Sequence, residues 1–254
     1  MIIRFLLAAL AAGLFAGIAM TPLQVTKVVP IILHAEEFEG GGHAHVSAAQ
    51  ADAHVHTDGS SHTAVDQTVA ASQNTTAHVD DAEAETDAPQ FFGRFWNTVL
   101  ANLVTGAGFA LLMAGVSMAS GVNVTFATGL AWGAAGWMAV QFLPAIGLPP
   151  ELPGIPYVDL AARQYWWVAT VVMSIIGLAM VFLNKGAVSR AAGVVLILAP
   201  HVYGAPQPTD ITSAVPAFLA GEFVVATFAT TLFFWLTLGL AMGWVMDRAK
   251  LDEA

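Results

Sequence analysis

The sequence lacks cysteine altogether and has few charged residues. Without cysteine the chain forms no disulfide, no thiolate zinc site and no iron–sulfur cluster, and it has no thiol nucleophile. Charged residues make up 10% of the chain, whereas a soluble domain carries about 25%. Together with a hydrophobic content of 57%, this excludes an ordinary soluble domain and indicates an integral membrane protein with several helices.

Two further absences narrow the function. No basic face is available for a nucleic acid. The sequence contains no phosphate-binding glycine loop, no serine hydrolase motif and no zinc protease motif, so an ATPase or a hydrolase has no support. We therefore expect a protein that is not an enzyme.

Charge is concentrated in one region. Residues 34–90 hold eleven Asp and Glu, seven of the eight His, and no Lys or Arg. The region has a single aromatic residue, Phe38, and too little apolar surface to offset the entropy of ordering it. The chain is therefore predicted to divide into a first transmembrane helix (1–33), a disordered acidic and His-rich loop (34–90, the insert), and a membrane helix bundle (91–254).

Apolar segments predict an all-α, polytopic membrane bundle, since a spanning helix needs about 20 apolar residues. The first span follows a single Arg4, and no small-residue cleavage site follows Met20, so we expect an uncleaved helix rather than a signal peptide. The segment 187–203 is short and carries Arg190 and His201, which leaves five or six transmembrane helices. After the insert, the predicted spans are 95–118, 124–148, 164–183, 187–203 and 218–246.

Lys and Arg residues predict the orientation. With six helices both termini lie on one side of the membrane, together with five basic residues, and three basic residues lie on the other. The positive-inside rule then places the chain in the inner membrane with cytoplasmic termini and an extracytoplasmic insert. The five residues are Arg4, Lys185, Arg190, Arg248 and Lys250, and the three are Lys27, Arg94 and Arg163.

Histidines in the insert predict metal capture. Two His-x-His pairs occur, and residues two apart in an extended chain point to the same side, so each pair can present two imidazoles to one ion. Imidazole with nearby carboxylates suits divalent Zn, Cu, Ni and Co, and binding should fail at low pH. Two alternatives are a solvated linker with incidental histidines and a pH sensor. The predicted ligands are His34, Glu36, Glu37, His43, His45, His54, His56, His62 and His78.

A second set of residues is a candidate transport path, because ionisable groups at membrane depth are functional candidates. His201 is the single histidine outside the insert, and with Glu222 it can form an ion relay between adjacent helix ends. Asp159 can pair with Arg163 four residues later. The alternatives are interfacial side chains, a plain proline-rich loop and, for the buried amide, an interhelical hydrogen bond. The candidates are His201, Glu222, Glu151, Asp159 and Asn102.

Small and aromatic residues are interpreted structurally. Glycines recur inside the spans, including a GxxxG at Gly239 and Gly243, and we expect them to pack helices within the chain rather than to form a dimer face. Tryptophans such as Trp166, Trp167 and Trp244 are expected at the membrane interfaces, with no chemical role.

The order of four motifs resembles the CbtA family of proposed cobalt transporter subunits. The resemblance implies cobalt uptake linked to cobalamin synthesis, and a small one-span partner, CbtB, with a His-rich end. It covers nearly the whole chain. The motifs are NLVTGAGFA (102–110), LPAIGLPPELPG (143–154), DLAARQYWW (159–167) and PHVYGAPQP (200–208).

Three hypotheses for function follow. The first is an uptake protein in which the insert collects Co²⁺ or Ni²⁺ and the helices conduct it, driven by the membrane potential. The second is a membrane scaffold or metal sensor that binds through the insert without transport. The third, a membrane enzyme acting on a lipid, requires a convergent acid cluster in the membrane, which the sequence does not show.

Overall fold

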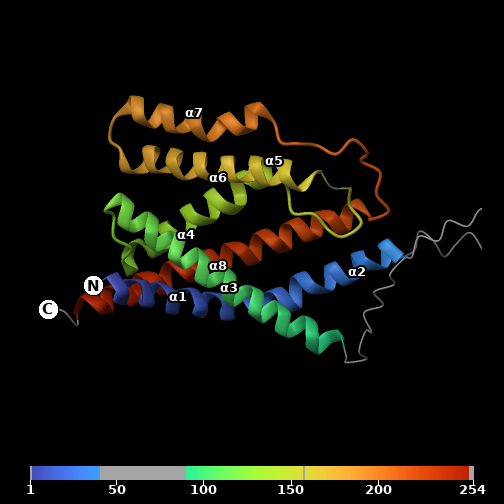
Figure 1. Ribbon diagram of the computed structural model, residues 1–254, viewed down its shortest axis with the longest axis horizontal. Coiled ribbons are helices and arrows are strands. Elements are labelled where there is room, and N and C mark those ends of the chain that lie inside the picture. The colour runs from blue at the N-terminus through green and yellow to red at the C-terminus, as the bar shows by residue number, and fades with distance from the viewer. Residues whose placement is uncertain (1, 41–89, 157, 252–254) are drawn as a thin grey trace, which may run out of the picture.

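The computed structural model describes residues 2–40, 90–156 and 158–251, and all their regular structure is helical, without a strand (Figure 1). This confirms the predicted all-α membrane bundle. Six of the predicted metal ligands lie outside the described residues: His43, His45, His54, His56, His62 and His78.

The first membrane segment is longer than predicted. It consists of α1 (Ile2–Leu23), a π-helical segment η1 (Gln24–Val28) and α2 (Val29–Gly40), which follow one another without a break. Residues 34–40, which the composition assigned to the disordered insert, are therefore helical. An ion pair between Glu36 and Arg94 of the following helix ties this end to the bundle.

The remaining helices run back and forth beside the first. Five helical stretches are long and apolar enough to cross a membrane. A sixth helix, α7, has 17 residues, which gives a length of about 25 Å, and it packs along α6 (Figure 1). The elements are α3 (Gln90–Ser120), α4 (Phe126–Trp137), the π-helical η2 (Met138–Phe142), α5 (Leu143–Gly147), α6 (Leu160–Leu183), α7 (Ala187–Tyr203) and α8 (Ala217–Leu251).

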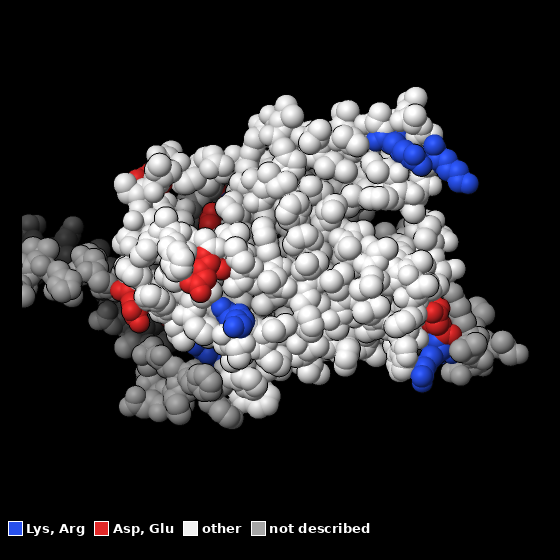
Figure 2. All heavy atoms as spheres, turned by 180° about the vertical axis from the view of Figure 1, so that it is seen from behind, with Lys and Arg blue, Asp and Glu red and all other residues white. Residues whose placement is uncertain are grey.

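The bundle has two distinct ends. The terminal end holds the starts of α1 and α4 and the end of α8, and the pocket end holds the end of α2, the start of α3 and the loops 148–159 and 204–216 (Figure 1). On the face shown in Figure 2, charged side chains lie at the two ends and an uncharged band separates them. Such a band matches the hydrocarbon layer of a membrane.

Close backbone contacts hold the helices together. α1 meets α3 at Gly13 and Gly106, and α4 meets α8 at Gly129 and Gly239, where an added Cβ would collide with a backbone carbonyl of the facing helix. α6 and α7 meet in the same way. The GxxxG glycines thus pack within the chain, as predicted, because small residues let helix backbones approach closely.

Two apolar clusters form the core. The terminal cluster joins α1, α3, α4 and α8, and the pocket-side cluster joins η1 and α2 to loop 148–159 and the start of α8. Loop 148–159 is anchored in the second cluster by Leu152, which is 3% exposed. The terminal cluster includes Ala16, Met20, Ala110, Phe234, Trp235, Leu238 and Met242, and the pocket-side cluster consists of Val28, Ile31, Ala35, Leu152, Val215, Leu219 and Phe223.

Candidate functional site

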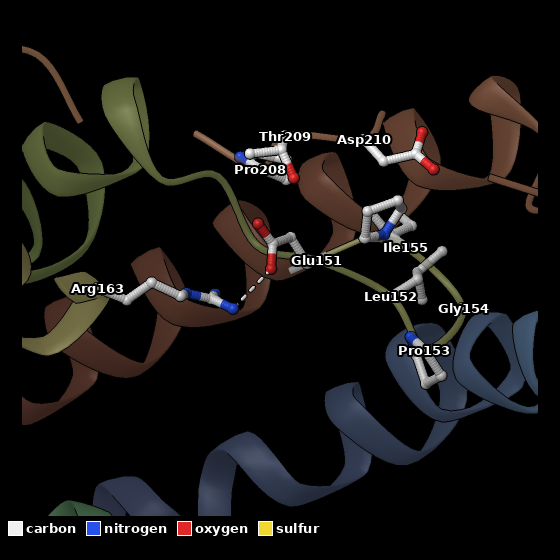
Figure 3. A pocket seen from close by; sticks show the side chains of 10 residues that line it. Glu151, Leu152, Pro153, Gly154, Ile155, Arg163, Pro208, Thr209 and Asp210 are labelled. Carbon is white, nitrogen blue, oxygen red and sulfur yellow. Dashed lines mark ion pairs between the residues drawn. The ribbon is translucent and has the colours of Figure 1, made fainter. Parts of the chain in front are cut away.

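An open cavity of about 800 Å³ lies at the pocket end (Figure 3). Three segments that are distant in the sequence line it: loop 148–159, the first turn of α6 and loop 204–216. Polar and charged groups share this lining with proline and aliphatic side chains. The lining residues are Glu151, Leu152, Pro153, Gly154, Ile155, Pro156, Arg163, Pro208, Thr209 and Asp210.

An ion pair lies in the lining of this cavity. Glu151 Oε2 lies 2.8 Å from Arg163 Nη1, and the two side chains are 22% and 30% exposed (Figure 3). The predicted pairing of Arg163 with Asp159 is wrong. Asp159 is the N-cap of α6, and its Oδ1 accepts a hydrogen bond of 2.9 Å from the Ala162 amide. Because that carboxylate is turned toward the start of its own helix, the guanidinium is directed to Glu151.

Local sequence explains the shape of the loop that carries Glu151. Pro149, Pro150 and Pro153 have no amide hydrogen and disfavour helix in the residue before them. Gly154 adopts a φ of +78° at the turn, a conformation that glycine adopts without a steric penalty. Its carbonyl accepts a 3.0 Å hydrogen bond from the Ser213 hydroxyl, which ties the two pocket loops together.

His201 lies beside α6, the helix that carries Arg163, rather than beside Glu222. Its ring packs edge-on against Trp166, with 5.9 Å between ring centroids, and its Nε2 is buried and has no hydrogen-bond partner among the described residues. The Trp166 indole donates a 3.3 Å hydrogen bond to the Pro200 carbonyl and is 7% exposed. The assignment of Trp166 to an interfacial belt is therefore wrong, because its ring fills the α6–α7 contact.

The predicted His201–Glu222 relay is not assembled. α7 packs on α6, and within the described residues neither a hydrogen bond nor an ion pair joins His201 to Glu222. Glu222 is an exposed residue near the start of α8. Its position at the pocket end is as the sequence suggested, but its side chain contributes nothing to the His201 environment.

Asn102 lies apart from the pocket. It is 6% exposed, and its Nδ2 donates a 3.1 Å hydrogen bond to Thr21 Oγ1, whose own hydroxyl donates to the Gly17 carbonyl. The bond joins α3 to α1. Asn102 thus makes the interhelical hydrogen bond that the sequence offered as the alternative to a role in transport.

Three predicted ligands at the start of the insert lie on α2. Glu36 accepts two hydrogen bonds of 2.9 Å from Arg94, a bidentate pair. Glu37 and His34 are exposed, and the His34 ring lies near Phe38. In the part of the chain that the structure describes, no three His, Asp or Glu side chains gather closely enough to hold a metal ion.

Asp210 maintains a negative charge at the pocket rim. Its Oδ1 accepts hydrogen bonds from the Thr212 amide at 2.9 Å and from the Thr212 hydroxyl at 2.8 Å. These bonds favour the ionised form, and they lower the pKa of Asp210 below its ordinary value. Arg163, Trp166 and Asp210 were not predicted as site residues. The signal that could have found them is their position in or next to the PPE, RQxWW and APQP motifs.

The segments that line or support the pocket are three of the motifs found in the sequence. Segments 143–154, 159–167 and 200–208 meet at one end of the bundle. Gly147 marks the contact, since a Cβ there would meet both the Trp166 ring and Ala205. Gly147 and Ala205, which are 58 positions apart in the chain, thus lie side by side.

Comparison with known proteins identifies the family. Residues 2–247 match the family described as a probable cobalt transporter subunit (CbtA). No curated protein and no solved structure matches the chain. The match extends over both halves of the bundle and over all three motif segments at the pocket, so the chain belongs to the CbtA family of probable cobalt transporter subunits.

Proposed function

We propose that this chain is the membrane-embedded subunit of a system that takes up divalent cobalt. The insert collects the ion outside the inner membrane, the pocket end receives it, and the helices conduct it inward. Cobalt delivered in this way feeds cobalamin synthesis, and a one-span CbtB-like subunit works beside this chain.

One observation carries the proposal. The three motif segments that belong to the family converge on the cavity at the pocket end, and this is the end at which the insert leaves α2 and rejoins α3. A metal-collecting segment attached there raises the effective concentration of the ion at the cavity. Acidic groups at the same end, namely Glu37, Asp210 and Glu222, attract a cation electrostatically.

Charge distribution supports an inward direction of transport. Arg4, Lys185, Arg190 and Arg248 lie at the terminal end, and this end is therefore proposed to be cytoplasmic. A cation entering from the pocket end then moves down the membrane potential, which contributes about 2.3 kcal/mol per charge for each 100 mV. No separate energy source is needed for the first step of uptake.

The test is uptake of radioactive Co²⁺ by cells that express this chain with and without its candidate one-span partner. Ni²⁺ and Zn²⁺ are added as competitors to define the preferred ion. We expect uptake that Co²⁺ saturates and that Ni²⁺ inhibits more strongly than Zn²⁺. Absence of uptake in both strains, with metal still bound to the chain, would overturn the proposal.

A matched pair of deletions tests the role of the insert. Residues 43–57 contain four histidines and residues 63–77 contain none, and both segments are 15 residues long. We expect removal of 43–57 to reduce uptake at low Co²⁺ and to leave it intact at high Co²⁺. Removal of 63–77 should have no effect at either concentration, because it shortens the insert equally without removing imidazoles.

A metal-binding scaffold or sensor is the second candidate. Its support is that the described residues hold no cluster of three metal-ligating side chains. Replacing His201 and Glu222 together distinguishes the two functions. If the chain is a transporter that uses these residues, the double variant loses uptake and retains metal binding by the insert. If the chain is a scaffold, the replacement changes neither uptake nor metal binding.

A further inference from the structure

A layer of uncharged polar side chains crosses the bundle between its two apolar clusters. On the first helix the terminal cluster ends at Met20 and the pocket-side cluster begins at Val28. On α8, which runs in the opposite direction, the corresponding residues are Phe234 and Phe223. The polar residues between these limits that are not exposed, with their hydrogen-bond partners, form the polar layer: Thr21, Gln24, Asn102, Trp137, Thr227, Thr230 and Thr231. Thr26 and Lys27 lie in the same stretch of the first helix but are exposed.

Most polar groups in this layer are satisfied within the protein. Asn102 bonds to Thr21, and the Trp137 indole donates a 3.1 Å hydrogen bond to Thr231 Oγ1. The hydroxyls of Thr230 and Thr231 donate to carbonyls four residues earlier in α8. These bonds join α1 to α3 and α4 to α8, so part of the layer serves to hold the helices together.

Two oxygens in the layer are exceptions. Gln24 Oε1 and Thr227 Oγ1 are buried and have no hydrogen-bond partner among the described residues. The Thr227 hydroxyl does not bond to the preceding turn of its own helix, unlike the hydroxyls of six other helical threonines. That bond is made by Thr21, Thr26, Thr98, Thr170, Thr230 and Thr231.

Both π-helical segments lie at this level. Gln24 is the first residue of η1, and η2 begins directly after Trp137, which bonds to α8. η1 and η2 both pack against α8. Single π-helical turns inside α-helices occur frequently at functional sites, because the widened turn redirects side chains and backbone carbonyls.

We propose that Gln24 and Thr227 form an intramembrane transit site for a divalent cation that retains part of its water shell. This inference rests on the proposed uptake function and adds the residues through which the ion passes. An amide oxygen and a hydroxyl oxygen accept hydrogen bonds from the ion's water ligands, and such charge-assisted bonds are stronger than neutral ones.

The absence of carboxylates from the layer suits transit rather than storage. None of the seven residues in the polar layer is ionisable at neutral pH. Conduction requires binding that is favourable enough for entry and weak enough for exit. Neutral oxygens meet that requirement, whereas a buried carboxylate would hold a divalent ion tightly. The acidic groups remain at the pocket end, where the ion is first attracted.

The first test separates this role from a structural one. Thr227→Val preserves shape and removes the hydroxyl, and we expect it to lower the initial rate of Co²⁺ uptake about tenfold, the effect of losing one charge-assisted hydrogen bond. Because it also removes an unpaired buried oxygen, protein level and thermal stability should be unchanged or higher. Ser174→Ala is the matched control, since Ser174 Oγ on α6 is likewise buried and unpaired, and it should leave uptake intact.

Uptake at the wild-type rate in Thr227→Val would overturn the transit site and leave the proposed function standing. Absence of uptake in the wild-type chain would instead overturn the proposed function. A second measurement, which does not depend on uptake, then tests whether the transit site exists. The chain contains no cysteine, so Thr227→Cys introduces the single thiol of the protein.

That measurement is the reaction of Thr227→Cys with a small, positively charged methanethiosulfonate. A hydrated path brings the reagent to the thiol, and we expect modification that added Co²⁺ slows. Ser174→Cys, outside the layer, should remain unmodified. Failure of Thr227→Cys to react, or a reaction that Co²⁺ does not slow, would overturn the transit site.

Discussion

At the terminal end the helices are joined by the short connections 121–125 and 184–186, and neighbouring helices meet backbone to backbone at glycines. At the pocket end the loops 148–159 and 204–216 are long, and they are held by an ion pair, a buried leucine and side-chain hydrogen bonds. Irregular backbone in a membrane protein is tolerated where it is buried in protein or lines an aqueous cavity. The terminal end therefore holds the helices rigidly together, whereas the pocket end presents a shaped, charged surface.

The largest effect is expected where helices meet at the terminal half. Gly239→Leu places a side chain against the Gly129 carbonyl, and we expect stability to fall by about 3 kcal/mol or the protein to be lost. Gly221→Leu lies on the same helix with nothing within 4 Å of the added Cβ, and it should be tolerated. Thermal unfolding in detergent measures both, and equal stability of the two variants would contradict the close packing.

The next effect concerns the function of the pocket end. Glu151→Gln removes the charge that faces Arg163, and we expect Co²⁺ uptake to fall about tenfold while stability falls by about 1 kcal/mol. Glu36→Gln is the matched control because it breaks the other ion pair of the pocket end, away from the cavity. Uptake assays with equal amounts of protein test the difference. Equal losses of uptake in both variants would show that the effect comes from removing any acidic charge at this end rather than from a change in the cavity.

A smaller effect is expected at the terminal end, and it should affect stability alone. Asp247 Oδ2 accepts a 2.8 Å hydrogen bond from the Phe126 amide at the start of α4. Asp247→Ala should cost about 1 kcal/mol of stability, as for a lost helix cap. Uptake per folded molecule should remain at the wild-type level. A loss of uptake without a loss of stability would break the contrast between the two ends.

The smallest effect concerns pH at the pocket rim. Because its folded-state pKa is lowered, Asp210 stabilises loop 204–216 at pH values above its unfolded pKa, and this contribution is lost as the pH falls through the folded value. Hydrogen exchange at the Thr212 amide should therefore accelerate at acid pH. In Asp210→Ala the exchange should already be fast at neutral pH, and unchanged protection there would show that the Asp210 bonds do not order the loop.

The class of fold was predictable from the sequence because the hydrocarbon layer imposes a strong rule. Apolar stretches of about 20 residues must be helical when every backbone group has to be satisfied within the chain. The same reasoning failed at residues 34–40, which continue α2. Composition reports whether a segment can form its own core, and this segment is instead held by Phe38, which packs against the pocket-side cluster, and by the Glu36–Arg94 pair.

Parts of the candidate site were predictable and others were not. Glu151 was selected because acidic residues are few in the hydrophobic body, and the structure places it in the lining of the cavity. The predicted partner of Arg163 was wrong, since a spacing of four favours Asp159 only when Asp159 is not a helix cap. Trp166 was assigned to an interface because sequence alone does not show which face of α6 meets α7.

The sequence by itself determined that the chain is a helical membrane protein, that its acidic and His-rich residues are concentrated in one stretch, and that it resembles the CbtA family, to which it belongs. The tertiary structure alone decided that three of these motifs share one cavity, that Arg163 pairs with Glu151, and that Gln24 and Thr227 lie in one polar layer. The physical reason is the distance along the chain over which each effect acts. Hydropathy and local turns act within a few residues, whereas cavities and pairings depend on how distant helices pack.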